Sequence, residues 1–270
     1  MPDGQIEIAT QAMAGQPAAG PAVVVNGLVK RFGETTILDG LDLSIAHGSA
    51  VAIIGANGTG KSTLLRCLIR LIEPSTGSIR VLGEDVHALP PQALIRLRAR
   101  VGMVFQKHNL VPRLSALTNV VHGVQSREHG PRTWSQVLAR DEVRAEALQC
   151  LEAVGLAEKS SQRADRLSGG QSQRVAVARM LMQRPEIVLA DEPDASLDPR
   201  SGEDVMRTLF ELAKSKGLTL AFVSHRVEHA LRFSDRIVGL AHGRVVLDAP
   251  ARECDAAGLR AFFADDEARA

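Results

Sequence analysis

Aromatic residues and cysteines are scarce in this sequence, and both shortages exclude classes of protein. There is no tyrosine, and aromatic residues make up only 3% of the chain. A surface of stacked aromatic rings for single-stranded nucleic acid is therefore not expected. The three cysteines, Cys67, Cys150 and Cys254, lie far apart and show no CxxC spacing. An odd number of isolated cysteines argues against a disulfide framework and fits a reducing cytosol.

An excess of one charge and a long apolar run are also missing. Lysine and arginine number 32 and aspartate and glutamate 31, which gives a formal net charge of +1. A strongly basic nucleic-acid coat is excluded, and we expect no nucleic-acid partner. No window approaches the roughly 18 consecutive apolar residues that a membrane span needs. The N-terminus has neither the basic start nor the apolar stretch of a signal peptide, so we expect a chain without a span of its own.

What is present is an ordinary globular composition with alternating elements. The 270 residues are 45% hydrophobic and 23% charged, enough for one large or two small domains with a proper core. Apolar runs at 50–54, 187–190 and 218–223 have the length of buried strands, and helical patterns separate them. This alternation predicts an α/β fold, a mostly parallel sheet with helices on both faces.

The chain divides by pattern into five segments. Charge is dense and strands are few between residues 90 and 166, where the pattern predicts an inserted helical subdomain with a helix over 135–153. The full division comprises a flexible tail at 1–21, an α/β core at 22–89 and 167–248, the helical subdomain with the lobe junction at 90–166, and a C-terminal tail at 249–270. In that last segment Leu259, Phe262 and Phe263 stand among acids and predict a short amphipathic helix that caps the core.

The strongest chemical signal is a glycine-rich stretch between the strand at 50–54 and an amphipathic helix predicted at 62–72. It fits the pattern GxxxxGK[ST] in the strand–loop–helix context that confirms it. Glycines let backbone N–H groups turn toward phosphate oxygens, and a helix N-terminus adds a positive field. We expect Lys61 to reach the β- and γ-phosphates and Ser62 to bind Mg²⁺. The predicted nucleotide-binding residues in this stretch are Gly55, Ala56, Asn57, Gly58, Thr59, Gly60, Lys61, Ser62 and Thr63.

A pair of carboxylates forms the second signal. The apolar run 187–190 ends in Asp191 and Glu192, at the strand edge where open α/β sheets bind their ligands. We expect Asp191 to hold Mg²⁺ through its water shell and Glu192 to polarise the attacking water. An apolar run that ends in Asp-Glu is weak evidence alone, but it becomes strong beside a phosphate loop. The fold class is therefore a P-loop NTPase core, with an antiparallel β edge and the helical insertion.

A third stretch carries a resemblance to a known family. Residues 167–171 read Leu-Ser-Gly-Gly-Gln, which matches the signature loop of the ATP-binding subunits of ABC transporters. P-loop proteins in general lack this segment. The resemblance covers residues ~22 to ~248, with six motifs in the expected order. It implies that two subunits sandwich two ATP molecules head to tail, so that Ser168, Gly169, Gly170 and Gln171 serve the nucleotide of the partner subunit.

The same resemblance assigns roles to four more positions. Gln106 fits the family's Q-loop glutamine, which contacts Mg²⁺ or water and links the lobes. Asp198 fits the D-loop at the dimer seam, although Asp198-Pro199 also suits a plain helix start. His225 fits the switch histidine that senses γ-phosphate. Phe32 falls where the family places an aromatic ring on adenine, and a place in the core remains equally open for it.

A finer likeness points to one kind of transporter. The stretches 105–111, 113–115, 118–120 and 195–199 resemble the ATPases of phosphonate importers. The resemblance implies an ATP-hydrolysing subunit that works as a homodimer with two transmembrane permease subunits and a periplasmic or surface solute-binding protein. Such a subunit would lie on the cytoplasmic face of the cell inner membrane. Importers of polar amino acids or other small solutes share much of the pattern, and a soluble ABC ATPase without a transport role is a further alternative.

Two residues depart from the family pattern: Ser172 follows the signature stretch where glutamine is frequent, and Asp194 lies near the predicted site. Asp194 stands where a small neutral residue or threonine is common. It does not touch the proposed chemistry, but an additional carboxylate there is expected to weaken nucleotide affinity.

Overall fold

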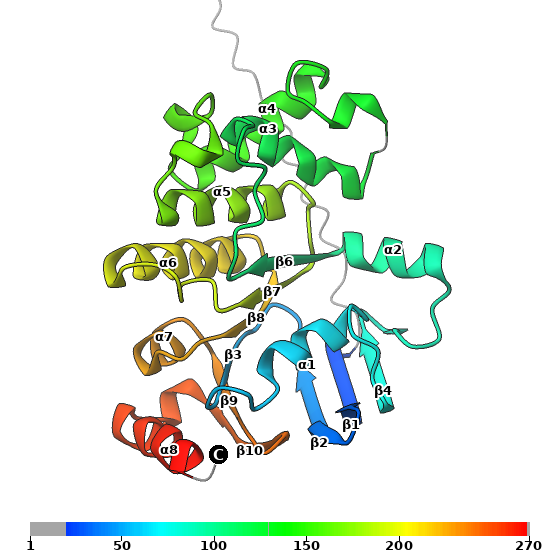
Figure 1. Ribbon diagram of the computed structural model, residues 1–270, viewed down its shortest axis with the longest axis vertical. Helices are drawn as coiled ribbons and strands as arrows, with labels where there is room; N and C mark the ends of the chain where they lie inside the picture. The colour runs from blue at the N-terminus through cyan, green and yellow to red at the C-terminus, as the bar shows by residue number, and fades with distance from the viewer. Residues whose placement is uncertain (1–19, 129, 269–270) are drawn as a thin grey trace, which may run out of the picture.

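A computed structural model describes residues 20–128 and 130–268, so all but two residues of the tail predicted at 1–21 lie outside the described residues. Its centre is a six-stranded sheet in the order β10-β9-β3-β8-β7-β6, in which only β10 runs antiparallel to its neighbour (Figure 1). The strands are β3 (Ala50–Ile54), β6 (Val101–Phe105), β7 (Ile187–Asp191), β8 (Thr219–Val223), β9 (Arg236–Ala241) and β10 (Arg244–Pro250).

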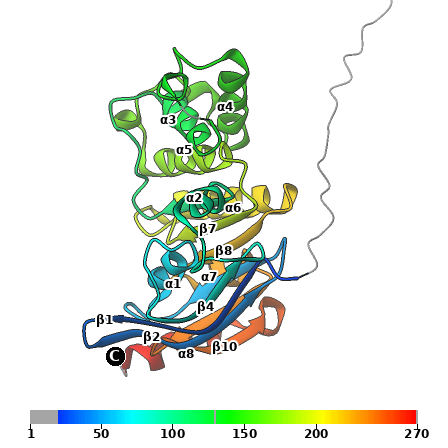
Figure 2. The same ribbon diagram turned by 90° about the vertical axis from the view of Figure 1, so that its right-hand side faces the viewer.

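A second sheet lies beside the first and is antiparallel throughout. Its order is β2-β1-β4-β5, and it provides the antiparallel β part of the predicted fold class. The strands are β1 (Val23–Phe32), β2 (Thr35–Ile45), β4 (Thr76–Val81) and β5 (Glu84–Asp85). Figure 2 shows this sheet and the six-stranded sheet at one end of the molecule and helices α3 and α4 at the other.

Helices cover both faces of the six-stranded sheet. In Figure 1, α1 and α2 lie on one side of it and α5, α6, α7 and α8 on the other. The helices are α1 (Lys61–Leu68), α2 (Pro91–Ala99), α3 (Ala116–Val121), α4 (Asp141–Ala153), α5 (Gly169–Leu181), α6 (Pro199–Ser215), α7 (Val227–Arg232) and α8 (Ala256–Ala268). Short 3₁₀ turns occupy His122–Ser126, Pro131–Thr133, Ala157–Lys159, Ala164–Arg166 and Ala251–Glu253.

The alternation of side chains along β3 explains why the sheet needs cover on both faces. Val51 and Ile53 pack with the residues of β1, β2, β4 and α1, while Ala52 and Ile54 pack with the opposite helices. All five residues of β3 are at most 1% exposed, because successive side chains of a strand point to opposite faces and each face meets a core. The predicted α/β fold, with a mostly parallel sheet covered on both faces, is confirmed.

The helices and strands that form the helical lobe are not the same as those within the expected segment 90–166. Strand β6 lies within that range, but it pairs with β7 and forms an edge of the six-stranded sheet. Helix α5 lies beyond that range, yet it packs on α3 and α4 as well as on β6 and α6. The lobe is therefore built from α3, α4 and the intervening turns, and α5 joins it to the core.

Two predicted helices are shorter than their patterns suggested. The helix predicted over 135–153 begins at Asp141, because Val137 and Leu138 are 78% and 53% exposed and offer no buried face. The helix predicted over 62–72 ends at Leu68, and Arg70 follows with left-handed backbone (φ 51°). The C-terminal helix does form: Leu259 is 3% exposed, and Phe262 and Phe263 pack partly buried on the core.

Candidate functional site

The ends of four parallel strands meet at one edge of the six-stranded sheet. The register pairs Ile53 with Val223, Val223 with Asp191, and Asp191 with Phe105. The residues that follow these strands therefore leave the sheet side by side, as the carboxyl ends of parallel strands must. They are the phosphate loop after β3, Gln106 after β6, Glu192 after β7, and His225 shortly after β8.

The phosphate loop is shaped by three glycines in the left-handed backbone region, and two of them, Gly55 and Gly60, also leave no room for a Cβ. Gly55, Gly58 and Gly60 have φ values of 150°, 84° and 98°, and a Cβ on Gly60 would lie 2.6 Å from Leu38 Cδ2. Helix α1 begins directly after Gly60, so its free backbone N–H groups open toward the loop. This arrangement is a cradle for an anion.

The Lys61 side chain lies inside the loop. The residue is 4% exposed, and its Nζ donates hydrogen bonds to the carbonyl oxygens of Gly55 at 2.9 Å and Ala56 at 2.5 Å. A buried ammonium group is costly without acceptors, and here the loop carbonyls are among its acceptors. Phosphate oxygens are acceptors of the same kind, so Lys61 can exchange these bonds for contacts with a nucleotide.

Asp191 is tied to the phosphate loop from the neighbouring strand. It is 5% exposed; Ser62 Oγ donates a hydrogen bond to its Oδ1 at 2.6 Å, and Arg66 Nη2 lies 3.3 Å from its Oδ2. A hydroxyl and a carboxylate are the oxygen ligands that Mg²⁺ prefers, so this donor set fits the ion. Within residues 20–128 and 130–268 no cluster of three or more His, Cys, Asp or Glu is arranged to hold a metal.

Glu192 and His225 contact each other directly. Glu192 Oε1 lies 2.7 Å from His225 Nε2, and the side chains are 21% and 32% exposed. Glu192 also has left-handed backbone, with φ 49°, which is uncommon for a residue with a side chain and marks a turn under constraint. The pair can bind a water molecule, and its carboxylate can accept a proton from it.

A cleft of about 260 Å³ borders the phosphate loop. Phe32 is one wall of it and Glu192 another, with Lys61, Ser62 and Thr63 between them. Phe32 is 49% exposed, so it does not belong to the core, and Lys30 Nζ lies 4.6 Å from the centre of its ring. The use of this ring as an adenine platform stays a prediction.

The signature segment lies elsewhere on the chain, beside the turn before α6. Ser168 caps α5: its Oγ accepts a hydrogen bond from the Gln171 backbone N–H, and the Gln171 side chain accepts one from the Ser168 N–H. Glycines at 169 and 170 allow a close approach, because added Cβ atoms would lie 3.1 Å from Leu197 and 3.0 Å from Ser201. Ser168 and Gly169 are exposed, so the segment faces outward in the single chain.

Asp198 starts α6 as its cap. Its carboxylate accepts a hydrogen bond from the Ser201 backbone N–H at 3.0 Å. Hydrogen bonds from Ser201 hold the pKa of this exposed carboxyl below its ordinary value. Asp198-Pro199 therefore does start a helix, as the sequence suggested. The position of Asp198 at a dimer seam stays a prediction.

Several positioning residues were not predicted from the sequence. Gln173 is fully buried and donates from Nε2 to the Phe105 carbonyl at 3.2 Å. Arg179, whose pKa burial lowers, donates to the carbonyls of His108 and Asn109 at 3.0 and 2.7 Å. Both lie in α5, so this helix holds the loop that carries Gln106. Their polar side chains within a helical pattern gave no sign of these partners.

Comparisons with known proteins agree with this geometry. The family profile described as ABC transporter matches residues 38–195, more than half of the chain. The chain belongs to the ABC transporter family. The predicted resemblance is thereby confirmed, and the chain is the ATP-binding cassette of that family.

The relatives of this cassette are named for import. A protein of Frankia casuarinae named phosphonates import ATP-binding protein PhnC is 50% identical, over 87% of this chain and 92% of its own. A protein of Mycolicibacterium smegmatis named phosphate-import ATP-binding protein PhnC is 47% identical, over 87% of this chain and 90% of its own. The predicted likeness to phosphonate importer ATPases is confirmed at this level.

Solved cassettes share the fold. A dimeric ATP-binding cassette in a post-hydrolysis state with ADP and phosphate matches with a TM-score of 0.74 and 33% identity, over 85% of this chain and 99% of that one. A cassette from Clostridium perfringens, part of the ABC transporter complex cbiONQ, matches with a TM-score of 0.77 and 28% identity, over 87% of this chain and 90% of that one.

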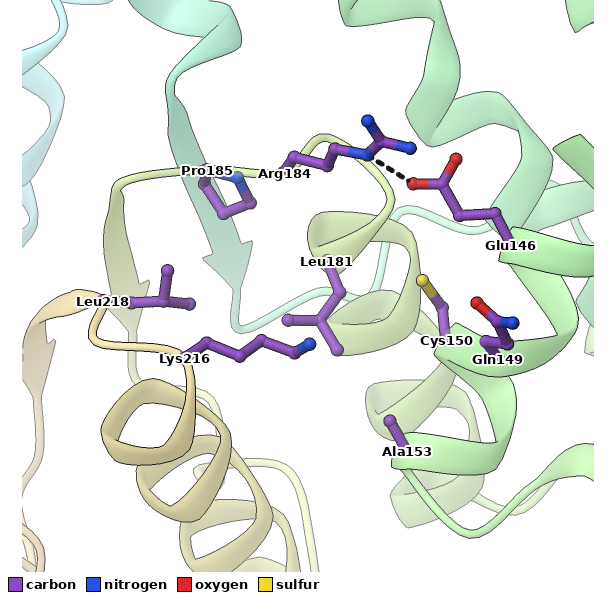
Figure 3. Close-up of a pocket in the computed structure, with 9 residues that line it drawn as sticks. All are labelled: Glu146, Gln149, Cys150, Ala153, Leu181, Arg184, Pro185, Lys216 and Leu218. Atoms are coloured by element: carbon purple, nitrogen blue, oxygen red, sulfur yellow. Dashed lines mark hydrogen bonds and ion pairs between the residues drawn. The ribbon is translucent and has the colours of Figure 1, made fainter. Parts of the chain in front are cut away.

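A larger cavity, of about 680 Å³, lies away from the phosphate loop, between the helical lobe and the core (Figure 3). Glu146 and Arg184 pair across its rim, with Nε 2.7 Å from Oε1. The Cys150 thiol also lines it, and burial, with a smaller effect of the Glu146 charge, raises its pKa to about 11. The remaining lining residues are Gln149, Ala153, Leu181, Pro185, Lys216 and Leu218.

Substitution of two phosphate-loop glycines should separate backbone strain from crowding. Gly58→Ala meets no atom within 4 Å, so it should lower the free energy of unfolding only by the left-handed backbone cost of about 1–2 kcal/mol. Gly60→Ala adds the contact with Leu38, and we expect a total loss of about 2–5 kcal/mol. Urea unfolding of the nucleotide-free protein measures both. Equal losses would show that the close approach at Gly60 is not needed.

Alkylation of Cys150 should be slow near neutral pH, because the thiolate is the reacting form. With a pKa of about 11, its rate with iodoacetamide should rise about tenfold per pH unit between pH 8 and 10. Peptide mass spectrometry, with Cys150→Ser to assign the labelled site, measures the rate. Glu146→Gln removes a negative neighbour and should speed the reaction at pH 8. A rate that levels off below pH 9 would contradict the raised pKa.

Proposed function

We propose that this chain is the ATP-hydrolysing subunit of an ABC importer for phosphonates or a related oxyanion. The observation that carries the proposal is 50% identity over 87% of the chain to a protein named for phosphonate import, together with a complete set of nucleotide-site motifs. The name of the Mycolicibacterium smegmatis relative, at 47% identity, favours phosphate as a second candidate cargo.

The hydrolytic site is proposed on the edge of the parallel sheet. ATP would lie with its phosphates in the loop 55–62, held by backbone N–H groups and by Lys61, and with its adenine on Phe32. Ser62 and Asp191 would hold Mg²⁺, with Gln106 within its reach; the ion would neutralise charge on the phosphate oxygens. Glu192 would take the proton of the attacking water, and His225 would contact the γ-phosphate.

A second copy of the chain is proposed to complete the site. Ser168 and Gly169 are exposed and Gln171 is partly exposed, with the buried Gly170 between them, at the N-terminus of α5, which suits an anion from outside the chain. In a head-to-tail homodimer they would meet the γ-phosphate held by the other copy, with Asp198 at the seam. Dimer closure would then depend on ATP, and hydrolysis would release it.

Membrane partners are proposed because the relatives of this chain are named as import ATP-binding proteins. No helix in the described part of the chain is long and apolar enough to cross a bilayer. Two transmembrane permease subunits would supply the pathway, and a periplasmic or surface solute-binding protein would deliver the cargo. The loop between β6 and α3 presents Val111, 43% exposed, beside the exposed Lys107 and Arg113, and suits docking to such subunits. The subunit would then lie on the cytoplasmic face of the inner membrane.

Glu192→Gln should abolish turnover and leave nucleotide binding. Loss of a general base lowers kcat by about 10²–10⁴-fold, while the Kd for Mg·ATP should change little because phosphate contacts remain. Phosphate release and equilibrium binding of ATP measure the two quantities. Glu211→Gln, an exposed residue of α6, is the matched control and should hydrolyse at the parental rate. A Glu192→Gln enzyme of parental activity would remove Glu192 from the mechanism.

The cargo can be tested by growth. A strain of the source organism that lacks this gene should fail to grow on a phosphonate as sole phosphorus source, and the wild-type gene should restore growth. The Glu192→Gln gene should not restore it. If the deletion strain grows normally on phosphonate but poorly on low inorganic phosphate, phosphate is the cargo. Normal growth on both would reject the oxyanion importer.

A further inference from the structure

Asp194, which departs from the family pattern, makes a buried contact with His229. Asp194 Oδ2 lies 2.9 Å from His229 Nδ1, and the two side chains are only 4% and 6% exposed. The geometry is not that of a well-aligned hydrogen bond, and the contact is an ion pair only when His229 is protonated. Arg226 Nη1 reaches the same carboxylate oxygen at 4.0 Å. Asp194 does not line the cleft between Phe32 and the phosphate loop, but it lines a neighbouring cavity together with Glu192 and His225.

This pair joins the same two segments as the Glu192–His225 contact. Asp194 lies two residues after Glu192, in the turn that leads from β7 to α6. His229 lies four residues after His225, in the first turn of α7. Two carboxylate–imidazole contacts therefore connect the turn after β7 to the segment 225–229, which runs from just after β8 into α7. The outer contact is partly exposed, with side chains at 21% and 32%, and the inner one is buried.

The surroundings of the inner pair fix it from several sides. The His229 ring meets the Phe233 ring edge-on at 5.6 Å, and Phe233 in turn packs on Phe210 of α6. Gly202 of α6 leaves room for Asp194, since a Cβ there would lie 3.2 Å from Asp194 Cβ. Figure 1 shows α6 and α7 next to each other on the same side of the sheet. The pair therefore lies where β7, α6 and α7 converge.

Stability alone is a weak reason for such a pair. A buried carboxylate and imidazole lose their hydration, and apolar side chains of similar volume commonly give equal or greater stability at such places. A contact between a carboxylate and an imidazole, however, fixes which two groups meet and at what distance, whereas an apolar contact does not. A specific geometric task explains the pair better than a contribution to the free energy of unfolding.

We propose that the Asp194–His229 pair is a positioning device, which holds the turn after β7 on helix α7 and so keeps Glu192 within reach of His225. The outer contact must open when ATP and water enter between the two groups, whereas the inner pair stays closed. The Asp194–His229 pair thereby returns Glu192 to the same position beside His225 after each round of ATP hydrolysis. This inference rests on the proposed hydrolytic role of Glu192 and His225, and neither Asp194 nor His229 touches substrate.

The first test reads the outer contact without activity. In the nucleotide-free protein, the ¹H–¹³C resonance of the His225 ring is assigned with His225→Gln, and Glu192→Ala gives its position without the carboxylate. Asp194→Asn and the double variant Asp194→Ala/His229→Leu should each move this resonance toward the Glu192→Ala position. The double variant carries an apolar pair and is expected to fold even if a single variant does not. An unmoved resonance in folded variants would overturn the proposal.

The second test separates positioning from general loosening. Asp194→Asn should lower kcat about tenfold and leave KM for ATP within about twofold, because misplacement of a catalytic group acts on the transition state. The double variant should lose no more than the worse single variant, since both substitutions break one contact. Leu231→Ala, which removes an apolar side chain of α7 that is partly buried against the core and has no contact with the Asp194–His229 pair, is the control and should retain the parental kcat.

The outcomes distinguish this inference from the proposed function. An equal loss of kcat in Leu231→Ala would mean that Asp194 and His229 have only a structural role. If the wild-type protein shows no ATP hydrolysis, the proposed function fails, but the His225 resonance still decides whether the inner pair sets the outer contact.

Discussion

The parallel register of β3, β8, β7 and β6 is the constraint on which the whole site depends. Each strand ends at the same edge, so residues separated by more than a hundred positions in the sequence leave the sheet as neighbours. The hydrogen bond from Ser62 to Asp191, at 2.6 Å, joins the first of these strand ends to the third. A slip of one residue in the β3–β8 or β8–β7 pairing would turn Asp191 to the other face relative to β3 and separate it from the phosphate loop.

The two cores keep that register in place. One core lies between the six-stranded sheet and the layer of α1, α2 and the antiparallel strands; the other lies under α5, α6, α7 and α8. Side chains of β3 alternate between the two cores, so a shift in register would expose apolar groups on both faces of the sheet. Such exposure costs a free energy of about 25 cal/mol for each Å² of apolar surface. Loops at the edge can therefore adopt costly backbone, such as the left-handed Glu192, because the sheet beneath them does not move.

How much of this was visible in the sequence depends on the range of each interaction. The phosphate loop, the strand that ends in Asp191 and the parallel sheet follow from local patterns of glycine and apolar residues, and the fold confirms them. Contacts between distant segments left no such trace. Gln173 looked like one more polar residue of a helix, and Asp194 looked like a stray charge, because their partners Phe105 and His229 are 68 and 35 residues away. The predicted start of the helix at residue 135 was wrong because Val137 and Leu138 are exposed and have no core to meet, whereas the helix itself forms from Asp141.

Helix α5 has a geometry whose consequence reaches beyond one chain. It is 13 residues long, or about 20 Å at the usual rise, with Ser168 at its start and Arg179, which grips the carbonyls of His108 and Asn109, near its end. A helix of this length behaves as a stiff rod on the scale of loop motion. A pull on the loop at 107–113 would reach Ser168 as a displacement of the same rod, with no hinge between. A force on the loop 107–113 and the proposed contact of Ser168 with the nucleotide of a second copy would thus be coupled through one rigid helix.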